Sequence, residues 1–304
     1  MRIDRPLVQN LALLCCHCLR LILLFAPVSC GRSDVSSSIE AYAYPDTVAA
    51  ACATGGRTGR AGASDGQVSA DGVRYHVRTP SNYDAAFAHP LLMVYAAAGR
   101  SGLAMERLTG LTPVATNAGL IVAYVDHQPL DVPAVERLGS LPSEIAKIWC
   151  VDERRVYATG HSDGGTVALA LALLDRTKDI PAAIAPSAAG WNGKDLAAYQ
   201  CPAPLPVMVM HGKNDRLFPG WGRQTADWWA SCNRCDMTKA PVAESGCLFY
   251  QGCEANGPTL YCEGSGGHRD WPGVNRLMME FFTQPEKFRR SPSFPLSGRD
   301  DLKE

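Results

Sequence analysis

A serine held between two glycines is the feature of this sequence with the clearest chemical meaning. The segment Gly160-His161-Ser162-Asp163-Gly164 matches the pattern G-x-S-x-G, in which a tight turn between a strand and a helix lifts a serine hydroxyl above the edge of a sheet. A strand is predicted over Arg155–Thr159 and a helix over 164–175, so the required context is present. Ser162 is therefore the predicted nucleophile, near the positive N-terminus of that helix. A glycine-rich turn without chemistry is the alternative interpretation.

The same pattern occurs a second time, as Gly62-Ala63-Ser64-Asp65-Gly66. No strand is predicted before this copy and no helix after it, so Ser64 is not expected to be a nucleophile. The pattern alone does not identify the reactive serine, and the surrounding elements decide between the two copies.

A serine hydroxyl becomes nucleophilic when a histidine takes its proton and an acid orients that histidine. In a strand–turn–helix site of this kind the acid and then the histidine follow the serine along the chain. Of the two histidines beyond Ser162, His268 lies in a glycine-rich turn after the last predicted strand and is the predicted base. His211 directly ends a strand and is expected to be structural.

Asp215, a short loop after the strand that ends at His211, is the predicted acid. Its rivals are Asp236, beside a group of cysteines, and Asp270, which is too near His268 in sequence to orient its ring easily. Asp195 and Asp227 are expected to be solvated helix residues.

The tetrahedral intermediate of acyl transfer carries a negative oxygen that needs two preset donors. The backbone N–H of Asp163 supplies one, and its side chain has no role in this scheme. The second is expected from Ala97 or Ala98, in the small-residue loop after the strand predicted over Leu91–Ala97. Trp191 and Trp221 fall in loops that would line a substrate pocket, with ordinary packing as the alternative.

Strand-length apolar segments alternate with helix-length segments between residues 69 and 284. Leu91–Tyr95 and Val207–Met210 are apolar at every position, which is typical of central parallel strands covered on both faces. The alternation predicts an α/β fold, a doubly wound and mostly parallel sheet with helices on both faces. The expected strands are Val73–Arg78, Leu91–Ala97, Leu120–Val125, Arg155–Thr159, Ala182–Ala185, Pro206–Met210 and Thr259–Cys262, and the expected helices are 101–118, 133–148, 164–175, 222–231 and 272–283.

The N-terminal segment has the features of a leader. Basic residues precede an apolar stretch that ends in Val28-Ser29-Cys30, so residues 1–30 are predicted to be a signal peptide, with a signal anchor as the alternative. Val28-Ser29-Cys30 resembles a bacterial lipobox, which predicts export to the periplasm or exterior and membrane attachment through a lipidated Cys30. Residues 31–68 are expected to be a flexible tether, 69–284 the catalytic domain and 285–304 a polar tail.

Eight cysteines lie beyond Cys30, an even set that suits disulfides in an oxidising compartment. The pair in Cys232-Asn-Arg-Cys235, with three later cysteines, leaves a zinc site as the less favoured alternative. No metal or cofactor is expected. A formal net charge of −1 gives no electrostatic basis for nucleic-acid binding, and the 46% hydrophobic content is enough for a core.

Three motifs together carry a family resemblance over about residues 70–284: Val151-Asp152-Glu153-Arg154-Arg155-Val156-Tyr157 followed by Gly160-His161-Ser162-Asp163-Gly164-Gly165, then His211-Gly212-Lys213-Asn214-Asp215, and then Gly266-Gly267-His268. In this order the chain resembles the bacterial poly(3-hydroxybutyrate) depolymerase and feruloyl esterase-like family of α/β-hydrolases. The resemblance implies a Ser162–Asp215–His268 triad and ester hydrolysis without a cofactor.

Two positions depart from that family. Ala96-Ala97 stands where the family often has His-Gly, and His268-Arg269-Asp270-Trp271-Pro272-Gly273 carries one residue more than the family's His-x-Trp-Pro-Gly. Members of that family that bind solid polyester usually carry a separate binding domain. Only about twenty tail residues follow the predicted domain here, so the expected substrates are soluble hydroxyacyl oligomers or short acyl esters. The alternatives are a feruloyl or acetyl esterase, a peptidase or acyltransferase with the same triad, and a catalytically silent binding lipoprotein.

Overall fold

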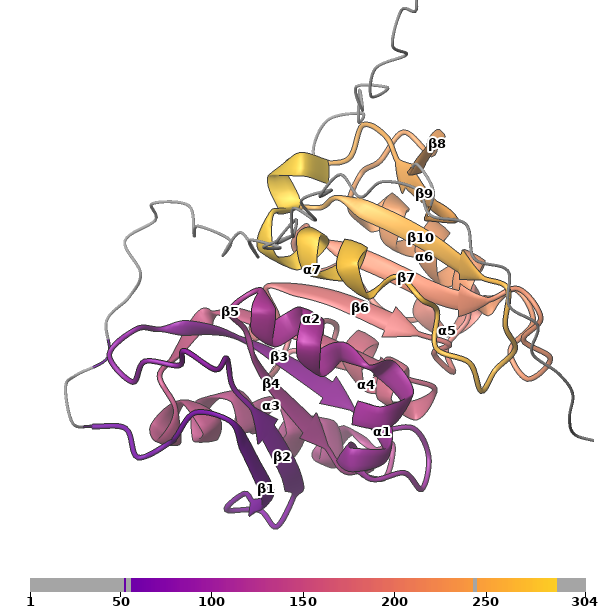
Figure 1. Cartoon of the computed structure of the whole chain (residues 1–304). Coiled ribbons are helices and arrows are strands. Elements are labelled where there is room, and N and C mark those ends of the chain that lie inside the picture. The colour runs from indigo at the N-terminus through magenta and orange to yellow at the C-terminus, as the bar shows by residue number, and fades with distance from the viewer. Residues whose placement is uncertain (1–51, 53–55, 243–244, 289–304) are drawn as a thin grey trace, which may run out of the picture. The chain divides into compact units, whose positions relative to one another are not determined.

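A ten-stranded sheet runs through the part of the chain that the structure describes (Figure 1). The structure is a computed structural model that describes Cys52, residues 56–242 and residues 245–288, all within the unit of residues 41–304. The strand order is β1-β2-β4-β3-β5-β6-β7-β10-β9-β8. The strands are β1 (Ala63–Val68), β2 (Arg74–Arg78), β3 (His89–Tyr95), β4 (Ile121–Val125), β5 (Val151–His161), β6 (Ala183–Ser187), β7 (Val207–Gly212), β8 (Lys239–Val242), β9 (Cys247–Tyr250) and β10 (Thr259–Gly264).

The middle of the sheet is parallel and both ends are antiparallel. Strands β4, β3, β5, β6, β7 and β10 pair in parallel, whereas β1, β2, β9 and β8 pair antiparallel. This confirms the predicted α/β fold with a mostly parallel sheet. All seven predicted strands are present. The carboxyl ends of the parallel strands meet at one edge, which is where ligands bind in such sheets.

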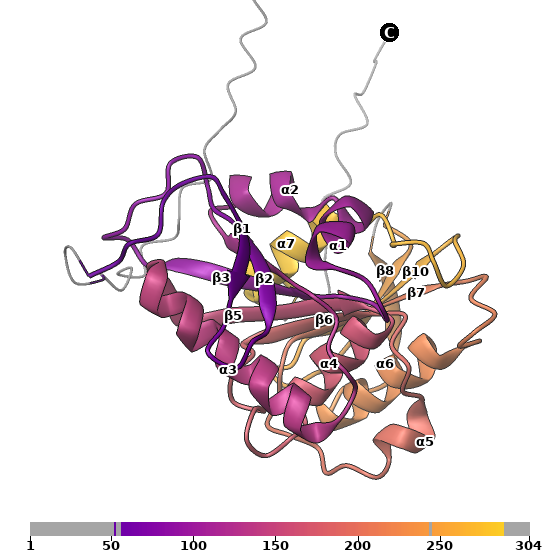
Figure 2. The same cartoon turned by 90° about the horizontal axis from the view of Figure 1, so that it is seen from below.

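Helices cover both faces of the sheet (Figures 1 and 2). Helices α3, α4 and α6 pack on one face, and α1, α2 and α7 pack on the other. The helices are α1 (Gly102–Thr109), α2 (Leu111–Asn117), α3 (Val132–Ile148), α4 (Asp163–Leu171), α5 (Gly193–Leu196), α6 (Trp221–Cys232), α7 (Asn275–Thr283) and the 3-10 helix η1 (Pro285–Phe288).

Alternate side chains of the central strands feed two separate cores. In β3, Leu91, Met93 and Tyr95 join the core under α3 and α4, and Leu92 and Val94 join the core under α1, α2 and α7. Every residue of β3 is buried, because both faces of the strand are covered.

The predicted domain boundaries need two corrections. Residues 63–68, assigned to the tether, form the edge strand β1, which pairs with β2. Its side chains are largely exposed, so the segment lacks the apolar alternation that identifies a half-buried strand. The predicted tail begins with η1, whose Phe288 is buried against Phe281 of α7. The described domain therefore begins before residue 69 and continues beyond residue 284.

The helix expected over 101–118 is two helices. Gly110 adopts a left-handed conformation, with φ of 58°, and ends α1 before α2 begins. Glycine tolerates this conformation without a Cβ penalty. Strands β8 and β9 were not predicted from the sequence.

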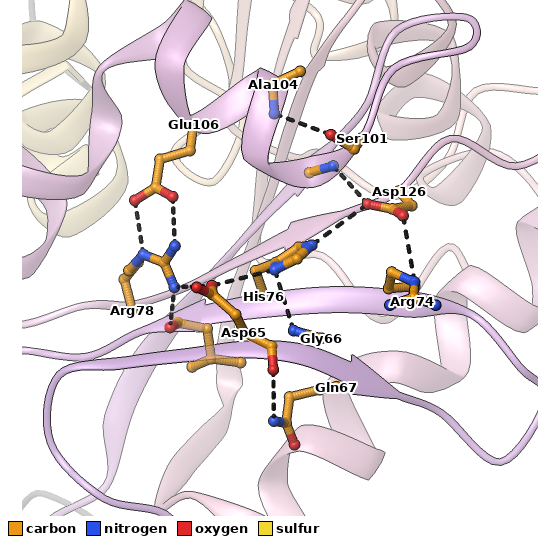
Figure 3. A network of polar contacts seen from close by, with 12 residues as sticks. Asp65, Gly66, Gln67, Arg74, His76, Arg78, Ser101, Ala104, Glu106 and Asp126 are labelled. Atoms are coloured by element: carbon orange, nitrogen blue, oxygen red, sulfur yellow. Dashed lines mark hydrogen bonds and ion pairs between the residues drawn. The ribbon is translucent and has the colours of Figure 1, made fainter.

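Ion pairs tie the first two strands to α1 (Figure 3). Arg78 of β2 donates to both carboxylate oxygens of Glu106 on α1, at 2.8 and 2.7 Å, and to Asp65 of β1 at 2.8 Å. Such bidentate pairs are stronger and more directional than single contacts. His76 of β2 lies between Asp65, at 3.2 Å, and Asp126 after β4, at 3.7 Å. The network holds α1 against the ends of β2 and β4.

All eight cysteines beyond Cys30 form disulfides, which confirms the disulfide prediction. The pairs are Cys52–Cys150, Cys201–Cys232, Cys235–Cys253 and Cys247–Cys262. Cys232 and Cys235 are not partners of each other. Within the described ranges, no three His, Cys, Asp or Glu side chains are grouped so as to hold a metal ion.

The predicted leader, Cys30 and most of the predicted tether lie outside the described residues. Among the helices that are described, none has the length and apolar character needed to cross a bilayer.

Two disulfides that close loops of very different length are expected to differ in their contribution to stability. Replacing Cys52 and Cys150 by alanine opens a loop of 98 residues, and a loop of about 100 residues corresponds to about 4.7 kcal/mol in the chain-entropy treatment. Replacing Cys235 and Cys253 opens a loop of 18 residues, for which about 3 kcal/mol is expected. Urea unfolding without reductant measures both losses. Equal losses, or a larger loss for the shorter loop, would contradict this order.

Candidate active site

Ser162 occupies a strained turn between β5 and α4. Its backbone has φ of 56° and ψ of −117°, a conformation that costs a non-glycine residue on the order of 1–3 kcal/mol. The turn is tight because a Cβ on Gly160 would lie 2.6 Å from the carbonyl oxygen of Tyr95, and one on Gly164 would lie 2.0 Å from it. The N–H of Ser162 donates to the carbonyl of Ser187 at the end of β6. The serine is thus fixed between β3 and β6.

The structure brings His268 and Asp215 to this serine. His268 follows β10 and Asp215 follows β7, and these two strands pair in parallel. The Nδ1 atom of His268 lies 2.8 Å from Oδ2 of Asp215, and its Nε2 lies 2.9 Å from Oγ of Ser162. When Nδ1–H donates to the carboxylate, Nε2 is left to accept the serine proton. This geometry is that of a nucleophile, a base and an orienting acid.

Asp215 is held as an anion in a buried position. Its side chain is 0% exposed, and its Oδ1 accepts the N–H groups of Leu217 and Phe218, each at 2.9 Å. Burial by itself raises the pKa of this carboxyl, but the Phe218 N–H, the His268 ring and the Leu217 N–H together hold the pKa below its ordinary value. A carboxylate is therefore available to orient His268.

His161, which precedes Ser162, holds the loop that carries His268. Its Nε2–H donates to the backbone carbonyl of His268 at 2.6 Å, and its Nδ1 accepts from the Ser187 hydroxyl at 3.0 Å. Burial lowers the pKa of His161, so the ring stays neutral in the tautomer that both bonds require. Sequence reasoning missed this role, and the only signal was the position of His161 inside the motif.

The remaining predicted rivals have other partners. His211 is buried and donates through Nε2 to the carbonyl of Phe218 at 2.9 Å, which agrees with the structural role expected for it. Asp270 accepts the N–H of Gly267 at 2.7 Å and so stabilises the turn that carries the base. Asp236 accepts the N–H of Thr238 at 2.9 Å, away from His268.

Asp195 and Asp227 also have partners in the structure. Asp195 completes a capping box with Asn192 at the start of α5. Asp227 pairs with Lys239 at 2.8 Å. Both lie in helices and are solvent-accessible, as predicted, since Asp195 is exposed and the Asp227 side chain is 39% exposed.

The loop after β3 lies against the nucleophile turn. Tyr95 is paired in register with Gly160, and a Cβ on Gly164 would lie 3.1 Å from the backbone of Ala96. Ala97 and Ala98 therefore follow directly beside the turn, with Ala97 half-buried and Ala98 exposed. The N–H of Asp163 is the first of α4 and has no acceptor within the helix. These are the positions expected of two oxyanion donors.

The side chain of Asp163, which has no role in the predicted catalytic scheme, has a partner in the structure. Its Oδ2 lies 3.0 Å from Nε2 of His127, which follows β4. The backbone N–H of His127 donates to the carbonyl of Arg100, at the far end of the Ala96–Gly99 loop. Nothing in the local sequence around His127 signals this contact, because the two residues belong to separate strand–helix units.

The two predicted pocket tryptophans differ in position. Trp221 stacks on Phe218 with ring centroids 4.6 Å apart, and Phe218 meets the His268 ring edge-on at 4.8 Å. This places an aromatic pair beside the base. Trp191 instead stacks on Tyr199 and packs against the core, which matches the packing alternative. Phe218 was not singled out from the sequence.

A cavity of about 250 Å³ lies on the outer side of the loop that carries the base. It is lined by the ends of β7 and β10, at Gly212 and Gly264, and by the loop after β10, including Asp270 and Trp271, and Ser162 is not part of its lining. Ser162 itself is buried, with 9% of its surface exposed.

Comparison with known proteins finds esterases among those similar to this chain. No family model matches the chain. A putative esterase, NocK, of Nocardia uniformis subsp. tsuyamanensis is 32% identical over 151 residues, which are 45% of this chain and 43% of that protein. Feruloyl esterase B of Piromyces equi is 26% identical over 230 residues, 65% of this chain and 42% of that protein. The chain thus spans less than half the length of these curated relatives.

Solved structures show the same fold at low sequence identity. An acetyl xylan esterase from Aspergillus awamori superposes with a TM-score of 0.53 and 17% identity, over 69% of this chain and 93% of that one. The fluorophosphonate-binding serine hydrolase F of Staphylococcus aureus gives a TM-score of 0.52 and 14% identity, over 74% and 99%. The chain has the α/β-hydrolase fold that was predicted.

The buried neutral histidines predict a loss of stability in mild acid. Burial lowers the pKa of His89, His161 and His211 in the folded chain from the ordinary 6.5. Below about pH 6.5 the unfolded chain binds protons that the folded chain does not, so the free energy of unfolding falls with pH by up to about 1.4 kcal/mol per unit for each histidine.

Urea unfolding between about pH 8 and about pH 5.5 measures this slope. The His89→Gln variant, which removes one of the three groups, is expected to show a shallower slope than the wild type. A free energy of unfolding that stays constant or rises on acidification would contradict the assignment of neutral buried rings.

Proposed function

We propose that this chain is a serine hydrolase that cleaves carboxylic esters through an acyl-enzyme intermediate. The observation that carries the proposal is the continuous chain of short contacts from Ser162 through His268 to Asp215. It is supported by the esterases among the similar proteins. The catalytic roles of these residues and of the donors below are part of the proposal.

In the first half of the reaction, Oγ of Ser162 attacks the ester carbonyl carbon while Nε2 of His268 takes its proton. The carbonyl oxygen becomes an oxyanion, held by the N–H of Asp163 and that of Ala97 or Ala98. The intermediate collapses by breaking the bond to the alcohol oxygen, and His268 gives this oxygen the proton. Asp215 stabilises the imidazolium without taking the proton.

In the second half, a water molecule attacks the acyl-serine. His268 takes a proton from the water, the same two donors hold the second oxyanion, and the acid leaves as Oγ of Ser162 recovers its proton. No metal or cofactor takes part in these steps. The replacement of His-Gly by Ala96-Ala97 leaves the scheme intact, because the donors are backbone groups.

The proposed substrates are short hydroxyacyl esters such as 3-hydroxybutyrate oligomers. This choice rests on the resemblance of the three motifs to the polyester depolymerase-like family. A second candidate, an aromatic acyl ester of the feruloyl type, is favoured by the stacked Phe218 and Trp221 beside His268 and by the similarity to a feruloyl esterase. An aromatic acyl group would gain from packing on such rings.

Export is part of the proposal. The four disulfides are typical of proteins from oxidising compartments. Together with the predicted leader they support a periplasmic or extracellular location, and the Val28-Ser29-Cys30 segment supports attachment through a lipidated Cys30.

The two G-x-S-x-G serines provide a matched pair of variants for the nucleophile. Ser162→Ala is expected to abolish labelling by a fluorophosphonate probe and to reduce ester hydrolysis by at least about 10⁴-fold, because only binding and oxyanion stabilisation remain. Ser64→Ala removes the other serine, in edge strand β1, and is expected to label and turn over as the wild type does. Labelling that persists in Ser162→Ala, or disappears in Ser64→Ala, would refute the assignment.

A panel of esters separates the substrate candidates. Initial rates with p-nitrophenyl acetate, p-nitrophenyl butyrate, 3-hydroxybutyrate oligomers and methyl ferulate are expected to give the highest kcat/KM for the hydroxyacyl substrates. The Phe218→Ala variant is expected to lose more activity towards methyl ferulate than towards acetate. A preference for ferulate establishes the second candidate, whereas no turnover of any ester by a correctly folded chain supports a silent binding protein.

A further inference from the structure

The side chains of His127 and Asp163 lie within hydrogen-bond distance of each other, in a contact that the proposed reaction does not use directly. Nε2 of His127 lies 3.0 Å from Oδ2 of Asp163, and the two side chains are only 25% and 28% exposed. His127 follows β4, and Asp163 is the first residue of α4, directly after the nucleophile. The contact therefore joins two elements that are separated by 36 residues in sequence.

The same histidine also holds the loop that follows β3. Its backbone N–H donates to the carbonyl of Arg100 at 3.0 Å, and the N–H of Arg100 donates to the carbonyl of Ala97 at 2.9 Å, which closes the turn. The preceding residue, Asp126, accepts the N–H of Gly102 through its side chain at 2.7 Å. Figure 3 shows Asp126 reaching the start of α1, beside Ser101. The end of β4 thus holds the C-terminal end of this loop, at Arg100 and Gly102.

These contacts reach the two residue segments that carry the proposed oxyanion donors. One donor is the N–H of Asp163, and the other is the N–H of Ala97 or Ala98. His127 is bonded to the side chain of the first and, through Arg100, to the turn that contains the second. Donors must lie about 2.7–3.1 Å from the oxyanion, and a displacement of about 1 Å costs about 10²-fold in rate.

The contact also affects charge. The carboxylate of Asp163 lies one residue from the nucleophile, where the oxyanion develops, and an unpaired anion there would repel the negative charge. The ring of His127 holds one oxygen of this carboxylate, Oδ2, by the contact with its Nε2.

We propose that His127 is a positioning residue that fixes the separation of the two oxyanion donors and holds the Asp163 carboxylate away from the developing charge. This inference rests on the proposed function. It assigns to His127 no contact with the reacting atoms. A merely structural surface pair would instead contribute about 0–1 kcal/mol to stability and leave the chemical step unchanged.

The test uses the full chain and measures kcat, KM and the affinity for an alkyl boronic acid, which adds to the serine and places an oxygen in the oxyanion site. His127→Ala is expected to lower kcat by about 10- to 100-fold with KM within about twofold, and to weaken boronate binding by a similar factor. His127→Gln, whose amide N–H is able to donate to the carboxylate, is expected to recover part of the loss.

Asp163→Ala and the double variant complete a cycle. If the pair acts as one unit, His127→Ala/Asp163→Ala is expected to be no worse than His127→Ala alone. Lys178→Ala is the matched control, because it breaks an ion pair of 2.8 Å with Asp175 beyond the opposite end of α4. It is expected to keep the wild-type kcat and boronate affinity.

Three results would overturn the inference: a kcat of His127→Ala within twofold of the wild type, a loss confined to KM, or losses that simply add in the double variant. If His127→Ala does not fold, as judged by urea unfolding, His127→Gln and Asp163→Asn supply the same comparison. A wild type that hydrolyses esters with an unaffected His127→Ala refutes this inference alone. A folded wild type that reacts with neither fluorophosphonate nor boronate refutes the proposed function and this inference with it.

Discussion

The turn at Ser162 depends on close backbone contacts at Gly160 and Gly164, two positions that have no space for a side chain. Gly160 and Gly164 both approach the carbonyl of Tyr95 so closely that a Cβ would overlap it, and the register of β3 on β5 sets this approach. The serine in return adopts a left-handed φ of 56°, whose cost on the order of 1–3 kcal/mol must be met by the surrounding sheet. The position of the hydroxyl, the start of α4 and the path of the loop after β3 all follow from this contact.

Hydrogen bonds from three strand ends converge on the same turn, and a fourth strand end reaches it through His268. His268 follows β10, Asp215 follows β7, Ser187 ends β6 and His127 follows β4. His268 and His127 each have a contact besides the one with the serine turn, as when His161 holds the carbonyl of His268 and the N–H of His127 donates to the carbonyl of Arg100. Because the parallel strands all present their carboxyl ends to one edge, residues far apart in the chain share one small region. Rigid strands hold such contacts more accurately than mobile loops would.

The fold was predictable to the extent that it is built from strongly apolar segments. β3 and β7 are continuous apolar runs, and they were found because a strand covered on both faces has no polar side. β1, at the exposed edge, carries mainly exposed side chains and is held by pairing with β2 and by the pair of Arg78 with Asp65. Its formation depends on a partner strand and not on an apolar pattern of its own. For this reason residues 63–68 were predicted to belong to the flexible tether. The break at Gly110 was missed for a related reason, since the helix pattern continues on both sides of it.

The sequence by itself determined the nucleophile turn and the order of its expected partners. A strand, a glycine-flanked serine and a helix are local features, and Asp215 and His268 stand out because each follows a recognisable strand. Only the tertiary structure decided which cysteines pair, that His161 holds the loop of the base, and that His127 reaches Asp163. These contacts join separate strand–helix units, and their distances are set by the register of parallel strands, which no local run of residues encodes.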